Sequence, residues 1–480
     1  MIQPSVDAAI DAPGPSTPPQ ARRASERVRT LLRTRSTTIA LFVVIVGALL
    51  ISVAHVRYFT SVSPVDGLMH IDYLYKAPHI VHDGEKVGQD AMREQACRGL
   101  VNWPSPGCST TATYNAETFQ EYGTNTAAIY TPFYYTLTKA VAAPLAATGG
   151  IGSLVTAGRL VSGLWLAGGL AMTFLVARRL GARPYVTAAL LLAAAATPNV
   201  LLPSATVTPD AAAQLAGASM VWSVLWWEER PRRRYWLPVL IALAVVALKA
   251  LNIIVVVLVA LYLVLRALHR VLWPHAADAV DTIDAAGAAP RRTPSGLQTA
   301  LCIVAISVVA MAGALGYILF TRATAVASTE NVSMAQLVAA SAFPRDGFIT
   351  HFGVFLQVFY APGWYVTVPL LGPIAQAVLG LVVFAGTFAA AFFVDRAPSV
   401  NRLLGVSLLV VGLVGAPLII AFSYFASGVY VPIPGRYALT LVPAGIAVAA
   451  SVIQRRSAQV VCIVGGLSCY LAVLGWLLTH

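Results

Sequence analysis

Residues 33–59 read RTRSTTIALFVVIVGALLISVAHVRYF, and this stretch determines the class of fold. Between Arg35 and Arg57 it contains no Asp, Glu, Lys or Arg, and it is long enough to cross a bilayer as a helix, which takes about 20 apolar residues. The whole 480-residue chain has the same character, because 58% of its residues are hydrophobic and only 11% are charged. A soluble domain has about 25% charged residues, so the composition excludes a water-soluble enzyme, a disordered protein and a disulfide scaffold.

Further apolar segments of spanning or near-spanning length follow along the chain. The complete set is Thr38–Val56, Leu154–Ala177, Pro184–Leu202, Asp210–Trp227, Trp236–Leu248, Leu251–Ala267, Leu297–Phe320, Val366–Val394, Leu403–Phe425, Tyr437–Ile453 and Val460–Leu478. We therefore predict an all-α polytopic membrane protein with about eleven transmembrane helices, surrounded by membrane lipid.

Arginine residues give these spans a direction. With a cytoplasmic amino terminus, most of the 32 Lys and Arg residues fall in the tail and the cytoplasmic connections, and all of these are arginine. Positive residues accumulate on the cytoplasmic side, so topology explains the net charge of +12 without nucleic-acid binding. The Arg- and Ala-rich composition is typical of a high-GC bacterium. We predict a multi-pass protein of the bacterial plasma membrane with an extracytoplasmic carboxyl terminus.

The segments outside the spans divide the chain. Residues 1–36 are rich in Pro, Ser, Ala and Arg and are expected to form a disordered cytoplasmic tail before a transmembrane domain at 37–480. Residues 57–150 form a large first extracytoplasmic loop with interfacial helices, and residues 268–296 form a cytoplasmic linker. In the outer loop, Cys97 and Cys108 are candidates for a disulfide, which oxidising conditions favour.

Two segments depart from the simple pattern. Thr131–Thr148 is apolar but contains two prolines and Lys139, and counting it as a span would place the later Arg clusters outside. We interpret it as a re-entrant or interfacial helix, although a spanning helix stays open. Lys249 and Asn252 interrupt the apolar stretch around residues 236–267, and such polar breaks are tolerated only in protein interiors or cavities.

Polar residues that border or interrupt the spans fall on the outer face. They are the acids Asp66, Asp72 and Asp210, the neighbouring His70, and the cations Lys249, Arg436 and Arg159. Asp66 and His70 are four residues apart, so a helix would place both on one face. Structural alternatives exist: Asp66 and Asp210 at helix starts, Lys249 reaching the interface, and Arg436 anchoring at the membrane boundary.

A carboxylate beside cations suits group transfer from a phosphate-linked donor. The carboxylate accepts the proton of an incoming hydroxyl as general base, and the cations neutralise the departing phosphate. No nucleotide-sugar pool exists outside the membrane, so the natural donor there is a lipid-linked phosphate.

The order of short motifs resembles the GT-C-fold membrane glycosyltransferases, which use polyprenyl-phosphate sugars, and especially their bacterial branch of predicted membrane proteins. The resemblance covers most of residues 38–445. The motifs are Pro64-Val65-Asp66 with His70, Ile129–Tyr135, Gly158-Arg159-Leu160, Arg178–Gly181, Thr208–Ala211, Leu248-Lys249-Ala250 and Gly435-Arg436-Tyr437.

The resemblance implies inverting transfer with Asp66 as the general base and with Lys249 and Arg436 on the donor phosphate. His70, Asp72, Arg159 and Asp210 complete the expected substrate-binding set. Members of this family often carry Glu directly after the Asp, whereas Gly67 follows here. The need for a divalent metal therefore stays open, with Asp72 as the alternative second acid.

We expect a hexosyl- or pentosyltransferase that moves sugar from a polyprenyl-phosphate donor to a glycan, lipid or protein acceptor of the cell envelope. The main alternative is a transporter or flippase of lipid-linked sugars, although the sequence shows no internal repeat of the kind common in transporters. A membrane sensor or scaffold, whose outer loop binds a partner, would not require Asp66.

Overall fold

The computed structural model describes residues 19–100, 104–148, 150–272, 294–326, 338–362, 368–394 and 399–480. Within these ranges the regular structure is helical, and β-pairing is confined to three isolated bridges. The prediction of an all-α membrane protein is therefore confirmed at the level of class.

In the described part of the chain, seven helices are long and apolar enough to cross a membrane. They are α1 (Pro19–Tyr58), α5 (Leu154–Arg179), α11 (Ile253–Leu272), α13 (Gly296–Ala323), α16 (Leu371–Phe392), α17 (Val400–Ser427) and α19 (Arg456–Thr479). An eighth span is formed if α6 (Pro184–Ala195) is joined to the segment Pro198–Ala205, which bends away from it by 78°.

The count of eleven full spans is not confirmed, because three of the predicted spans are short helices. These are α8 (Ala213–Glu229), α10 (Trp236–Leu248) and α18 (Val442–Val452). At about 1.5 Å per residue, α10 and α18 are shorter than the roughly 30 Å hydrocarbon core. Each of the three follows or precedes a 3-10 turn or break, at η5 (Pro209–Ala212), Lys249 and η9 (Gly435–Ala438) respectively. Each of these helices therefore begins or ends next to a candidate site residue, namely Asp210, Lys249 or Arg436.

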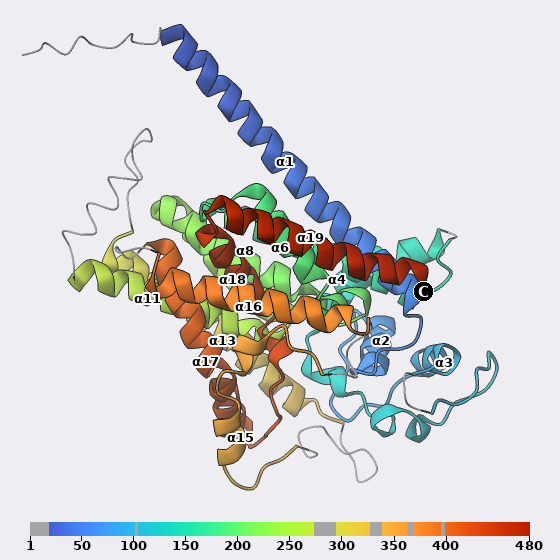
Figure 1. Ribbon diagram of the computed structural model, residues 1–480. Helices are drawn as coiled ribbons and strands as arrows, with labels where there is room; N and C mark the ends of the chain where they lie inside the picture. Colours follow the sequence, from blue (N-terminus) through green and yellow to red (C-terminus); the bar gives the residue numbers. More distant parts are fainter. Residues whose placement is uncertain are drawn as a thin grey trace, which may run out of the picture.

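The bundle is built around α5, which packs against α1, α4 (Pro132–Ala147), α8 and α18. Helices α1 and α19 pack together, and the end of α19 lies on the same side as α2 (Gly67–Lys76) and α3 (Gln89–Arg98), far from the start of α1 (Figure 1). The segments predicted to lie outside the membrane therefore share one end of the molecule.

Hydrogen bonds and a disulfide hold the first outer loop together. Cys97 and Cys108 are bonded to each other. Asp72 is buried, and its oxygens accept from the Gly88 amide at 2.7 Å and from Asn125 Nδ2 at 2.7 Å. It also pairs with Lys76 at 2.7 Å. Asp72 is thus the polar centre of this loop.

Helix α4 (Pro132–Ala147) has two different faces. Phe133, Leu137 and Val141 are exposed along one side, while Tyr135 and Thr138 are fully buried on the other. An exposed apolar stripe of this kind suits a helix that lies in the membrane interface, in agreement with the interpretation of Thr131–Thr148.

Several segment boundaries in the structure differ from those expected from the sequence. Helix α1 begins at Pro19, so the predicted tail at 1–36 is helical in its second half, and residues 1–18 lie outside the described ranges. The predicted linker 268–296 is shortened because α11 continues to Leu272 and α13 begins at Gly296; residues 273–293 lie outside the described ranges. The first outer helix begins at Gly67, directly after Asp66, which adopts a left-handed conformation that a helix cannot include.

Candidate functional site

Three distant segments bring an acid and two cations together. Asp210 comes from η5, Lys249 from the break after α10, and Arg436 from η9. Lys249 Nζ pairs with Asp210 Oδ1, and Arg436 Nε lies 3.8 Å from Asp210 Oδ2. The side chains of Lys249, Asp210 and Arg436 are 2%, 10% and 16% exposed, so the cluster is shielded from water. Two cations that face one carboxylate in a shielded site suit an anionic ligand.

Local hydrogen bonds stabilise the break that presents Lys249. Its backbone is extended, with φ −163° and ψ 124°, between α10 and the 3-10 turn η6 (Ala250–Asn252). Asn252 Nδ2 donates to the Val245 carbonyl at 3.2 Å, and the Thr131 hydroxyl donates to the Ala247 carbonyl. These bonds satisfy carbonyls at the end of α10 that would otherwise be costly at membrane depth. Asn252 therefore supports the site without facing the ion pair.

Aromatic rings flank the two cations. Lys249 Nζ lies 4.2 Å from the ring centre of Tyr437 and 5.4 Å from that of Tyr130. The guanidinium carbon of Arg436 is 5.3 Å from the Tyr437 ring. Cation–π contacts of this length stabilise buried cations. Tyr130 and Tyr437 lie within motifs noted in the sequence, and their role around the cations emerges only from the fold.

Asp66 stands at the start of α2 with an uncommitted carboxylate. Its backbone lies in the left-handed region, with φ 50° and ψ 23°, and its side chain does not cap the helix. Across the described part of the chain, the carboxylate has no hydrogen-bond or ion-pair partner. Left-handed conformations in residues other than glycine are uncommon and cluster at functional sites.

His70 connects Asp66 electrostatically to the ion cluster. Its Nδ1 lies 2.6 Å from the hydroxyl of Tyr135 on α4, and its ring is 5.4 Å from the ring of Tyr130. Burial lowers the pKa of His70 to about 4, although the nearby carboxylates of Asp66 and Asp210 oppose that shift. His70 is therefore neutral near pH 7. Both carboxylates, Lys249 and Arg436 act electrostatically on His70, and the Tyr130 ring lies 5.4 Å from the His70 ring and 5.4 Å from Lys249 Nζ.

The depressed pKa of His70 predicts acid sensitivity. The unfolded chain protonates this histidine below its ordinary pKa of 6.5, whereas the folded chain does so only near pH 4. Protons therefore favour unfolding, and stability should fall as the pH drops from 6.5 to 4, by up to about 3 kcal/mol from this residue. His70→Gln should lose less stability than the wild type when detergent-solubilised protein is melted at pH 7 and pH 5. Equal losses would contradict a buried neutral histidine.

Two predicted site residues lie elsewhere. Asp72 has both oxygens committed within the outer loop. Arg159 donates from Nε to the Ala205 carbonyl at 2.7 Å and from its Nη atoms to the carbonyls of Phe59 and Thr60. The prediction that these two residues join the others is corrected, because local partners hold each of them away from the Lys249 cluster.

The donor set does not fit a divalent metal. Asp210 is already paired with Lys249, and the oxygens of Asp72 are occupied, so Asp66 has no second free acid beside it. Among the described residues, no three His, Cys, Asp or Glu side chains gather in a metal-binding arrangement. The chemistry proposed for this site therefore uses no metal ion.

A comparison with protein families matches residues 84–444 to a family described as "Predicted membrane protein (DUF2142)". The chain belongs to this family. The DUF2142 match includes Asp210, Lys249 and Arg436 but begins after Asp66 and His70. No curated protein matches the sequence. Membership of DUF2142 therefore establishes a membrane protein and leaves its chemistry to be inferred from the site.

Proposed function

We propose that this DUF2142 protein is an inverting glycosyltransferase that moves sugar from a polyprenyl-phosphate donor to a cell-envelope acceptor on the extracytoplasmic face. The observation that carries the proposal is the buried cluster of Lys249, Arg436 and Asp210, together with the uncommitted carboxylate of Asp66, which acts electrostatically on the same His70 as the cluster does. Cations and a free base are the two elements that transfer from a phosphate-linked donor needs.

The cation cluster suits the donor phosphate. Asp210 holds Lys249 and Arg436 close together before any ligand arrives, so little reorganisation is needed to place a phosphate on them. As the bond between the anomeric carbon and the phosphate oxygen breaks, the leaving phosphate takes the electron pair. The two cations of the cluster stabilise the negative charge that develops on the phosphate.

Asp66 suits the acceptor side. In the proposed step its carboxylate takes the hydroxyl proton of the acceptor while the oxygen attacks the anomeric carbon from the face opposite the phosphate. The configuration at that carbon is therefore inverted. His70, four residues further on and neutral near pH 7, makes no ion pair with this carboxylate.

The proposal requires these residues to face the outside, which predicts the location of the carboxyl terminus. The proposed topology has the α4 segment at the interface and eleven crossings, with α8, α10 and α18 as short spans, so a reporter fused after His480 should be extracytoplasmic. Alkaline phosphatase at that position should be active and a fluorescent protein should be dark. The reverse pattern would contradict this topology and remove the basis for placing the Lys249 cluster on the outer face.

A transporter or flippase of lipid-linked sugars is the second candidate, because α10 and α11 form a broken helix with a buried ion pair at the break. Discontinuous helices of this kind form substrate sites in transporters. An assay of reconstituted protein, supplied with polyprenyl-phosphate sugar and envelope extract, distinguishes the transferase from the transporter. Glycosylated acceptor supports the transferase, whereas movement of the lipid-linked sugar without product supports the transporter.

A further inference from the structure

A second pair of cations lies outside the cluster described above. Arg159 on α5 and Arg98 at the end of α3 line a small pocket together with Ser61, Ser63, Gly67 and Thr206. The inner volume of this pocket is about 10 Å³. That is the space of roughly one water-sized group, too small for a sugar ring but sufficient for a single oxygen atom.

Arg159 carries a buried charge without an acidic counter-ion. Its exposed fraction is 4%, and its three hydrogen bonds all go to backbone carbonyls. Within the described ranges no carboxylate pairs with it. A buried cation without a paired anion is strongly unfavourable, so the pocket beside it should attract one.

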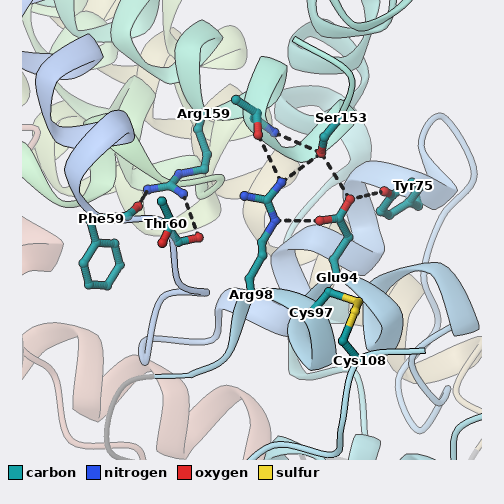
Figure 2. A network of polar contacts seen from close by, with 10 residues as sticks. Phe59, Thr60, Tyr75, Glu94, Cys97, Arg98, Cys108, Ser153 and Arg159 are labelled. Carbon is teal, nitrogen blue, oxygen red and sulfur yellow. Dashed lines mark hydrogen bonds and ion pairs between the residues drawn. A yellow bond between two sulfur atoms is a disulfide. The ribbon is translucent and has the colours of Figure 1, made fainter. Parts of the chain in front are cut away.

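Both guanidinium groups have N–H donors to which the described residues offer no acceptor. Arg98 donates from Nε to Glu94 at 2.6 Å and from Nη2 to the hydroxyls of Ser153 and Thr156 at 3.0 Å. A guanidinium has five N–H groups, so these bonds leave the pair on Nη1 of Arg98 unassigned, and two remain on Arg159 by the same count. In Figure 2 the remaining nitrogen of Arg98 lies on the side of Thr60 and Arg159.

The disulfide and the helix starts fix this arrangement. Cys97 precedes Arg98 and is bonded to Cys108, while Glu94 also accepts from Ser153 at 3.1 Å and from Tyr75 at 3.0 Å (Figure 2). Arg98 is therefore held between α3 and the start of α5. A rigid pair of forked donors suits a carboxylate or phosphate, whose oxygens accept several N–H groups at once.

We propose that Arg159 and Arg98 form an oxyanion subsite that receives a carboxylate or phosphate oxygen of the acceptor. Ser63 and Gly67, which line the pocket, flank Asp66 in the chain, so an acceptor anchored here would present a neighbouring hydroxyl to that carboxylate. The assignment to the acceptor rests on the proposed function, whereas anion binding at this pocket does not.

The test introduces a carboxylate into the pocket by mutation, in place of a bound anion. Ser61→Asp places a carboxylate in the pocket, and Ser63→Asp is a second version that keeps an oxygen acceptor for the Val65 amide. Thr113→Asp adds the same charge at an exposed position of the outer loop and is the matched control. Full-length proteins in phosphatidylcholine nanodiscs are melted in inorganic phosphate and in chloride at equal ionic strength.

Phosphate should raise the unfolding midpoint of the wild type and of Thr113→Asp above the value in chloride. Ser61→Asp should already melt higher in chloride, and its apparent affinity for phosphate should be at least about tenfold weaker. Arg436→Gln removes a cation of the donor cluster and so distinguishes phosphate binding at that cluster from binding at this pocket. A response that disappears in Arg436→Gln but persists in Ser61→Asp would overturn the proposal, as would equal effects of phosphate and chloride.

Failure of both carboxylate variants to fold would also overturn the proposal, since a pocket that lacks a counter-ion should accept one. In transfer assays the wild type should prefer acceptors with an anionic group beside the hydroxyl, and Ser61→Asp should lose that preference. Absence of any transfer by the wild type would refute the proposed function while leaving the phosphate result to decide the subsite.

Discussion

Asp66→Asn should lower the rate of sugar transfer by about 10²–10⁴-fold, the usual contribution of a general base. Asparagine keeps the size of the side chain and adopts left-handed backbone conformations readily, so the start of α2 with its φ of 50° should be preserved. The change removes only the proton acceptor. Transfer is measured in vesicles supplied with a polyprenyl-phosphate sugar, with expression and unfolding midpoint recorded for each variant.

Asp90→Asn is the matched control for this experiment. Asp90 is an exposed acid in the same outer loop, and its single ion pair is with Arg93. Asp90→Asn should leave the transfer rate unchanged, because surface ion pairs of this kind contribute little to stability. Full activity in Asp66→Asn with normal expression would remove Asp66 from the chemistry and leave the transporter as the better explanation of the site.

Lys249→Met should have the largest effect on stability. It removes the partner of a buried carboxylate, and breaking a buried pair in this way costs about 3–5 kcal/mol. Arg436 stays 3.8 Å from the same carboxylate, which favours the lower end of that range. Donor use should be lost as well, because the phosphate loses its deepest cation. The unfolding midpoint and the transfer rate are both measured.

A double variant separates stability from function in this cluster. Lys249→Met combined with Asp210→Asn leaves no unpaired carboxylate, so much of the lost stability should return. Transfer should nevertheless remain absent, since neither change restores the cation. A double variant that regains both stability and transfer would show that Lys249 is only a structural partner of Asp210.

The sequence alone predicted the class of protein, and the reason is energetic. Long runs without charge, such as residues 38–56, have no stable place except a membrane or a large protein interior, so length and composition suffice to find them. The break at Lys249 was visible for the same reason, because a lysine and an asparagine within an apolar stretch require protein partners. The disulfide candidate could also be named, since both cysteines lie in one loop.

The tertiary structure decided which polar residues belong together. Asp72 and Asp66 lie six residues apart and look equivalent in sequence, yet the buried partners of Asp72 commit it to the loop. Arg159 resembled a phosphate ligand, but its carbonyl partners place it in a separate pocket. Spacing along a chain carries no information about such long-range contacts. Asp210, Lys249 and Arg436 meet only because the segments before α8, after α10 and before α18 pack together, and that is a property of tertiary structure.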